Sequence, residues 1–307
     1  MVDVATIQIT RENKEILDDL SFEYRVKTPN QVITAMYQEL KQSRMIIQHL
    51  KEVELKPGAQ AYTRLAHAYL NRGLVDDALH VCKRAIELKP NCAEAYAYLG
   101  NTYLQKGLID DAINAYKTAI ELNPDFTVSY CRLGMAHMKK GLFDDAINSI
   151  KKSIELRSNA VVEYSILGIV YLSNNMLDDA INAYKKAIDL KPDYERAYYA
   201  YYYLGVAYRK KGLLEDAINA LKKAIELNPD FAMAYYNLGI AYRKKDLFDD
   251  AINAYKKSIE LNPDYAWAHY YLAIAYNEKG LPDDAINALK KAIELNPDFA
   301  NDKYKLC

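Results

Sequence analysis

Apolar residues recur along most of the chain at the spacing of helices that bury one face. Near residue 100, one apolar stripe is followed by a glycine, an acidic pair, a second apolar stripe and a proline. Because glycine breaks a helix and proline cannot continue one, this order predicts two short helices joined by a turn. The pair Asp110–Asp111 is placed to cap the second helix and to face its positive dipole. The first stripe comprises Tyr96, Leu99, Gly100 and Tyr103, and the second comprises Ala112, Tyr116, Ala119 and Ile120.

This two-helix pattern returns at a fixed interval. The phrase that opens the second helix occurs seven times, and successive copies lie 34 residues apart except for one step of 37. One hairpin cannot bury both of its stripes alone, whereas stacked neighbours can, so the pattern predicts an all-α repeat array. The copies begin at Asp76, Asp110, Asp144, Asp178, Glu215, Asp249 and Asp283.

The repeating unit resembles the tetratricopeptide repeat. Its pattern of Tyr, Leu, Gly and Tyr in the first helix, and of Ala, Tyr, Ala and a closing Pro124 in and after the second, is similar to that family's signature, with Tyr96 in the usual place of Trp. The resemblance implies a right-handed superhelical solenoid of seven repeats over residues 59–300. The departures should weaken single turns or contacts without changing the fold. They are Ala66 and Ala273 for the small Gly, Ser158 for the closing Pro, and Asn175 and Asp246 for the Gly between helices.

The family geometry also implies a concave groove lined by the first helices. The residues assigned to it follow a spacing of 3, 4 and 3, which places them on one helix side. The groove should be apolar in the middle and aromatic towards the C-terminal end. Its candidate binding residues are Met135, Met138, Ile169, Leu172, Tyr199, Tyr202, Arg209, Met233, Tyr236, Ile240, Arg243, Trp267, Tyr270 and Asn277.

An uncovered apolar face with aromatic and arginine side chains is typical of a protein interface. We therefore expect a scaffold or adaptor that binds an amphipathic helix or an extended peptide of another protein. Arg209 and Arg243 would meet an acidic group of that partner. Two alternatives stay open: these side chains only pack between neighbouring hairpins, or the chain's own N-terminus fills the groove.

One repeat contains three extra residues, in the sequence RAYYAYYYLG. Three residues turn a helix by about 300°, so Tyr198 and Tyr199 are expected to be displaced around their helix relative to neighbouring repeats. The insertion is either a tolerated slippage at a helix start or an aromatic patch that recognises a partner.

Residues 1–44 do not follow the repeat. The stretch ATIQIT alternates like a strand, and a helix start follows at Thr10 and another at Thr28–Pro29. This order resembles the ribbon-helix-helix family of DNA-binding dimers, which implies that Thr6, Gln8 and Thr10 could contact DNA. Residues 1–50 hold six basic and seven acidic residues, a weak basis for binding phosphates.

Two interpretations of the N-terminal segment remain. It can form a homodimer and contact DNA, in which case the protein is a transcription regulator whose repeats sense a protein or peptide. It can instead be a helical cap. Residues 45–58, with Ile46, Ile47, Leu50 and Val53, are expected to form a capping helix over the first repeat in either case.

The tail at 301–307 is too short to form a covering helix. Ile286, Leu289 and Ile293 of the last repeat should therefore be partly bare. Either copies of the array stack end to end, or the short tail folds back over this face.

Charge and composition narrow the class of protein further. The chain of 307 residues has 40 Lys and Arg against 41 Asp and Glu, so no overall charge attracts nucleic acid or an anionic membrane. It has no long apolar run and no signal-peptide pattern, and its four cysteines show no paired spacing, so we expect reduced thiols and a cytoplasmic location. No catalytic or metal-binding motif occurs, so we expect no enzyme, no cofactor and no metal site.

Overall fold

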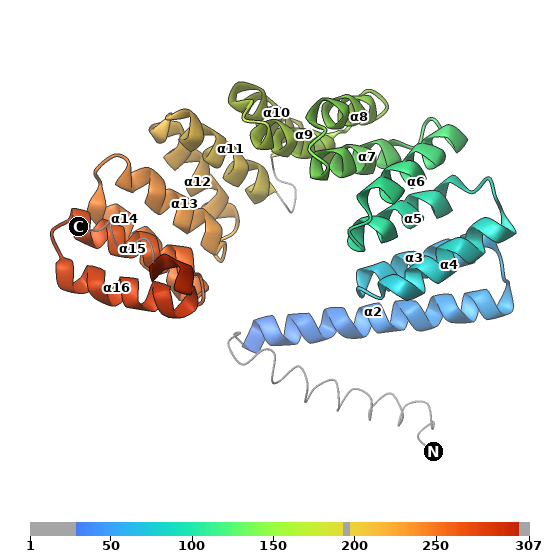
Figure 1. The fold of residues 1–307 in the computed structure, drawn as a ribbon, viewed down its shortest axis with the longest axis horizontal. Helices are drawn as coiled ribbons and strands as arrows, with labels where there is room; N and C mark the ends of the chain where they lie inside the picture. Colours follow the sequence, from blue (N-terminus) through green and yellow to red (C-terminus); the bar gives the residue numbers. More distant parts are fainter. Residues whose placement is uncertain (1–28, 193–196, 301–307) are drawn as a thin grey trace, which may run out of the picture. The chain divides into compact units, whose positions relative to one another are not determined.

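The computed structural model describes residues 29–192 and 197–300, and this part of the chain consists of helices joined by short turns and loops. Fifteen helices, α2 to α16, lie in this part of the chain (Figure 1). The chain divides into two compact units, residues 1–126 and 127–307. Within each unit, successive helices form antiparallel hairpins.

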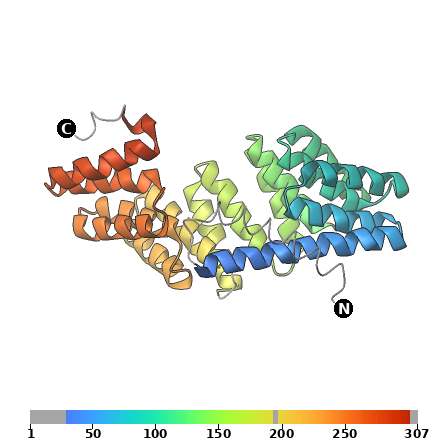
Figure 2. The ribbon, with the colours of Figure 1, turned by 90° about the horizontal axis from the view of Figure 1, so that it is seen from below.

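Unit 1 contains one long helix and two hairpins. The long helix α2 covers Pro29–Leu55, and the hairpins are α3 (Ala59–Asn71) with α4 (Val75–Leu88) and α5 (Ala93–Gln105) with α6 (Ile109–Leu122). The C-terminal half of α2 lies along α3, and its N-terminal half extends beyond the hairpins of this unit (Figures 1 and 2).

Unit 2 contains five hairpins that lie side by side in chain order (Figure 1). They are α7 (Thr127–Lys139) with α8 (Phe143–Glu155), α9 (Val161–Ser173) with α10 (Leu177–Leu190), α11 (Ala197–Lys211) with α12 (Leu214–Leu227), α13 (Ala232–Arg243) with α14 (Phe248–Leu261), and α15 (Ala266–Glu278) with α16 (Pro282–Leu295). These bounds confirm the helix pairs that the periodicity predicts.

The two helices of a hairpin pack closely where the first helix has a glycine. A large side chain of the second helix faces this glycine. A Cβ atom added to Gly168 would lie 2.6 Å from the ring of Tyr184, far inside van der Waals contact. Tyr184 is fully buried and belongs to the core of the first hairpins of unit 2, with Ile150 and Val170. The small residue of each first helix therefore makes room for the large core residue of the second.

Each hairpin turn contains one residue in the left-handed region. Five of these residues are glycines, with φ between 71° and 85°. Asn175 and Asp246 hold the same place with φ of 58°, a conformation that asparagine and aspartate adopt more readily than other side chains. The turn is thus preserved without glycine, as the sequence predicts.

The acidic pairs do not cap the second helices through their side chains, which corrects the expectation for Asp110–Asp111. The residue at the N-cap is a leucine such as Leu108, no side-chain cap hydrogen bond forms, and both aspartates lie in the first turn. There they still face the positive end of the helix dipole. In other hairpins the first acid also pairs with a lysine of the next hairpin, as in Lys106 Nζ to Asp76 Oδ1 at 2.5 Å. The equivalent pairs are Lys211–Asp178, Lys245–Glu215 and Lys279–Asp249.

The second N-terminal helix start is found at Pro29, but the helix does not end near residue 44. It continues to Leu55 as the single helix α2, so the stretch expected as a separate cap belongs to it. Ile46 and Val53 pack on the core around Leu65 and Val81, which covers the first hairpin. The expected strand, the helix start at Thr10 and the possible DNA contacts Thr6, Gln8 and Thr10 lie outside the described residues.

No helix in the described part of the chain has the length and apolarity needed to cross a membrane.

Candidate functional site: the first-helix face of unit 2

The first helices of unit 2 lie next to one another. Contacts link α7 to α9, α9 to α11, α11 to α13 and α13 to α15, in addition to the contacts of each second helix with the first helix that follows it. The residues predicted for the groove, from Met135 to Asn277, are therefore on neighbouring helices of one unit. We call the surface that they form the first-helix face.

Three residues of this face are large, apolar and exposed. Tyr199, Met233 and Trp267 have exposed fractions of 41%, 46% and 46%. They are spaced by 34 residues, so they take the same place at the start of α11, α13 and α15. Such a row is unusual on a surface that contacts nothing.

The inserted residues do not displace Tyr199, contrary to the prediction. Ala200 is buried like Ala234 and Ala268, so α11 keeps the register of the helices after it. Tyr198 and Tyr199 meet each other and the edge of Phe231, with ring centroids 5.2 and 5.4 Å from that phenylalanine. Helix α11 begins at Ala197, one residue earlier in this register than α13 does at Ala232.

Four of the predicted residues are buried by the chain itself. They are Leu172, Tyr202, Ile240 and Tyr270. The phenylalanine two residues after the closing proline of the hairpin explains two of these: Phe231 packs on Tyr202 at 4.9 Å, and Phe299 stacks on Tyr270 at 4.8 Å. These four side chains support the face from below and leave little area for a partner.

The remaining predicted residues are accessible to different degrees. Asn277 is exposed, and the others are partly buried: Met135, Met138, Ile169, Arg209, Tyr236 and Arg243. The apolar part of the face thus begins at α7, and its exposed aromatic residues are on α11 and α15.

The two arginines of the face differ in their surroundings. Arg243 is already engaged, because its Nη1 donates to Glu278 Oε1 at 2.7 Å and its guanidinium lies 5.5 Å from the ring centre of Tyr271. Arg209 makes no ion pair within the described residues, whereas the Nε atoms of both arginines are buried without a hydrogen-bond partner there. The repeat accounts for this difference: the residue 35 positions after Arg243 is Glu278, whereas the residue 35 positions after Arg209 is Lys244.

The charge of Arg209 acts on the phenols of Tyr202 and Tyr236. Burial raises the pKa of Tyr202 to about 12, although the charge of Arg209 and a hydrogen bond from Asn237 act in the opposite direction. Burial likewise raises the pKa of Tyr236, again against the effect of Arg209. Asn237 Nδ2 donates to Tyr202 Oη at 3.2 Å, which fixes that ring. Near neutral pH both phenols are therefore uncharged, so neither neutralises the charge of Arg209.

Sequence reasoning alone does not distinguish the two arginines. Periodicity places both on the same helix side, but Glu278 comes from the end of the next first helix. The comparison of positions 35 residues apart is the signal that could have separated them.

Successive helical hairpins whose first helices lie next to one another, as in unit 2, define a helical-repeat protein. Models of known families identify which one. The model described as "Tetratricopeptide repeat" matches residues 59–92, 161–194, 232–265 and 266–299, a second with this description matches 128–159, and one described as "TPR repeat" matches 100–141 and 205–246. Together these matches cover more than half of the chain, which belongs to the tetratricopeptide repeat family.

Solved structures share this fold. A chain in the crystal structure of the APC/C hetero-tetramer Cut9–Hcn1 is 22% identical, with a TM-score of 0.63, over 82% of this chain and 49% of that one. The structure of pilF of Pseudomonas aeruginosa is 16% identical, with a TM-score of 0.59, over 69% of this chain and 97% of that one. MamA (41-end) of Desulfovibrio magneticus RS-1 is 22% identical, with a TM-score of 0.51, over 56% of this chain and 96% of that one. The present chain thus spans about half the length of the Cut9–Hcn1 chain. No curated protein matches it by sequence.

Proposed function

We propose that the protein is a scaffold or adaptor that holds a segment of another protein on the first-helix face of unit 2. Tetratricopeptide repeat proteins are in general protein-interaction scaffolds, which agrees with this role. The observation that carries the proposal is Arg209, a partly buried cation without an acidic partner in the described residues. It belongs to the same face as the row of exposed apolar side chains, about 15 Å along α11 from Tyr199.

The chemistry of the face specifies the segment. An acidic side chain or a terminal carboxylate pairs with Arg209, because charge-assisted hydrogen bonds are the strongest that such a site offers. Large apolar or aromatic side chains of the same segment pack on Tyr199, Met233 and Trp267. Arginine, tyrosine and tryptophan are the residues that most often dominate binding energy at interfaces. Arg243 contributes little new charge, since Glu278 already neutralises it.

An unbiased peptide-display selection against the full chain tests this proposal. We expect the enriched peptides to combine one acidic group with large apolar residues. They should bind the Arg209→Gln variant about ten- to a hundredfold more weakly, because a hydrogen bond to a charged group is lost. Lys186→Gln is the matched control, since Lys186 is an exposed lysine of the second helix α10.

Two outcomes would refute the proposal. One is a set of enriched peptides without acidic residues. The other is equal loss of binding, or none at all, in the Arg209 and Lys186 variants.

A further inference from the structure

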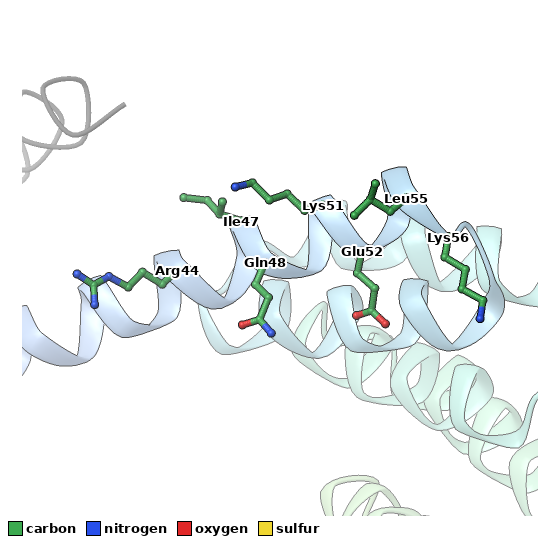
Figure 3. Close-up of a pocket in the computed structure, with 7 residues that line it drawn as sticks. All are labelled: Arg44, Ile47, Gln48, Lys51, Glu52, Leu55 and Lys56. Carbon is green, nitrogen blue, oxygen red and sulfur yellow. The ribbon is translucent and has the colours of Figure 1, made fainter. Parts of the chain in front are cut away.

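The outer side of α2 carries a basic and apolar stripe that no described residue covers. Arg44, Ile47, Gln48, Lys51 and Leu55 follow one another at helical spacing, and with Glu52 and Lys56 they line a surface pocket. Figure 3 shows Ile47, Lys51 and Leu55 pointing to one side of α2. Ile47 is 48% exposed and Leu55 is 87% exposed.

The opposite side of α2 accounts for its packing on the first hairpin. Ile46 and Val53 enter the core there, Arg72 donates to Ser43 Oγ at 2.7 Å, and Arg64 pairs with Glu52. The outer stripe is therefore a second face, which the role of α2 as a cover for the first hairpin does not explain.

Charge decides what can lie on this second face. Arg44, Lys51 and Lys56 form no ion pair with any described residue. Glu54, which also has no ion-pair partner among the described residues, is the nearest such acidic residue along α2. A second copy of α2 would bring like charges together, which disfavours self-pairing. The stripe instead suits an acidic segment with apolar side chains.

The chain contains such a segment before α2. Residues 12–23 hold five carboxylates and one lysine, together with Ile16, Leu17, Leu20 and Phe22. If this segment is helical, Ile16, Leu17 and Leu20 share one face. It thus offers acidic groups that complement the basic residues of the stripe and apolar side chains that can pack on its apolar residues.

The length of the connection permits the contact. On α2, Arg44 and Leu55 lie about 22 and 39 Å along the helix axis from Pro29, at 1.5 Å per residue. Residues 24–28 span up to about 17 Å when extended, and a helix over 12–23 spans about 18 Å. A segment that folds back along α2 therefore reaches most of the stripe.

We propose that residues 12–23 dock in cis on the outer stripe of α2, where their carboxylates meet Arg44 and Lys51 and their apolar side chains cover Ile47. In this arrangement α2 packs against the first hairpin on one side and against the chain's own N-terminal segment on the other. This role is independent of partner binding by unit 2.

Photo-crosslinking in the full chain tests the docking. Benzoylphenylalanine in place of Ile47 should crosslink to residues 12–23 of the same molecule. The same amino acid in place of Leu122, an exposed residue of α6, should not. Mixing ¹⁵N-labelled and unlabelled protein tells a crosslink within one copy from a crosslink between two copies.

Charge reversal tests the electrostatic part. Lys51→Glu should lower the crosslink yield about twofold or more, in line with the energy of exposed ion pairs, and the additional change Glu12→Lys should restore it. Lys117→Glu, on an exposed lysine of α6, should leave the yield unchanged. Three results would overturn the proposal. They are crosslinks that join two copies, crosslinks to residues other than 12–23, and a crosslink yield that Lys51→Glu does not change.

Discussion

At the scale of single residues, the positions that face each other across a hairpin compensate for one another. Gly100 and Gly168 face the fully buried rings of Tyr116 and Tyr184, which leave no room for a side chain. Where the first helix has Ala66 instead, the residue sixteen positions later is Cys82, which is much smaller than tyrosine. The departure from the repeat pattern at Ala66 is thus matched by its partner, so the hairpin packs without strain.

Two equivalent tyrosines differ in hydrogen bonding. Tyr116 Oη donates to Asn101 Oδ1 at 2.8 Å, whereas the residue that takes the place of Asn101 in the hairpin of Tyr184 is Ile169. The hydroxyl of Tyr184 is buried without a hydrogen-bond partner in the described part of the chain. The same residue type in the same place therefore has different surroundings.

This difference predicts opposite effects for one substitution. Tyr116→Phe should lower the free energy of unfolding by about 0.5–1.5 kcal/mol, because it removes a hydrogen bond and leaves Asn101 with one partner fewer. Tyr184→Phe should be neutral or stabilising, because it removes a buried hydroxyl that gains nothing from burial. Urea denaturation of both variants checks this. Equal losses in both would show that the two hydroxyls have equivalent surroundings.

At the scale of helices and turns, the left-handed residue between the helices sets the geometry of each hairpin. Asn175 and Asp246 hold this place with a side chain, at φ of 58°. Aspartate tolerates the left-handed region less well than glycine does, at a cost on the order of 1 kcal/mol.

Asp246→Gly should therefore raise the stability of unit 2 by up to about 1 kcal/mol, while Gly141→Ala should lower it by about 1–2 kcal/mol, since Gly141 has φ of 81°. Thermal melting of the two variants provides the comparison. Both turns are exposed, so changes in packing contribute little. A stabilised Gly141→Ala variant would contradict this account of the turns.

The helices themselves were predictable because their signals are local. Periodic apolar stripes, turn residues and a closing proline all lie within a few residues of the boundary that they mark. The burial of groove residues has a long-range cause. Tyr202 is buried because Phe231 from the turn after the next helix covers it. Contacts between hairpins decide which groove residues stay accessible, and one helix's periodicity does not contain that information.

At the scale of the whole molecule, the first and last hairpins end differently. The first hairpin is covered by α2, whereas nothing described covers the outer side of α16. Ile286 on that side is 51% exposed, as the sequence predicts, while the equivalent Ile252 is 5% exposed because the next hairpin packs on it. Leu289 and Ile293 are partly buried. The tail at 301–307 lies outside the described residues, so folding back of the tail and end-to-end stacking both remain predictions.

This asymmetry predicts a large difference between two identical substitutions. Ile252→Ala should cost about 2–5 kcal/mol of unfolding free energy, because it leaves a cavity between hairpins. Ile286→Ala should cost well under about 1 kcal/mol, because half of that side chain already contacts solvent. Chemical denaturation at low protein concentration measures both. A cost at Ile286 that approaches the cost at Ile252, and that grows with protein concentration, would indicate that a second copy covers α16.

The first-helix face contains a natural fluorescent probe for binding, the side chain of Trp267. Trp267 is the single tryptophan of the chain, and it lies on this face with nearly half of its side chain exposed. Its ring packs against Phe299 at 4.7 Å, so its emission reports on this part of unit 2.

Titration of the chain with an acidic, apolar peptide from the display selection, followed by Trp267 fluorescence, tests the central claim most directly. We predict that the emission shifts to the blue as the peptide saturates the face, because the indole leaves water. The midpoint should move to about ten- to a hundredfold higher peptide concentration in Arg209→Gln and stay unchanged in Lys186→Gln. Tight binding that leaves the Trp267 emission unchanged and is equal in all three proteins would contradict the claim.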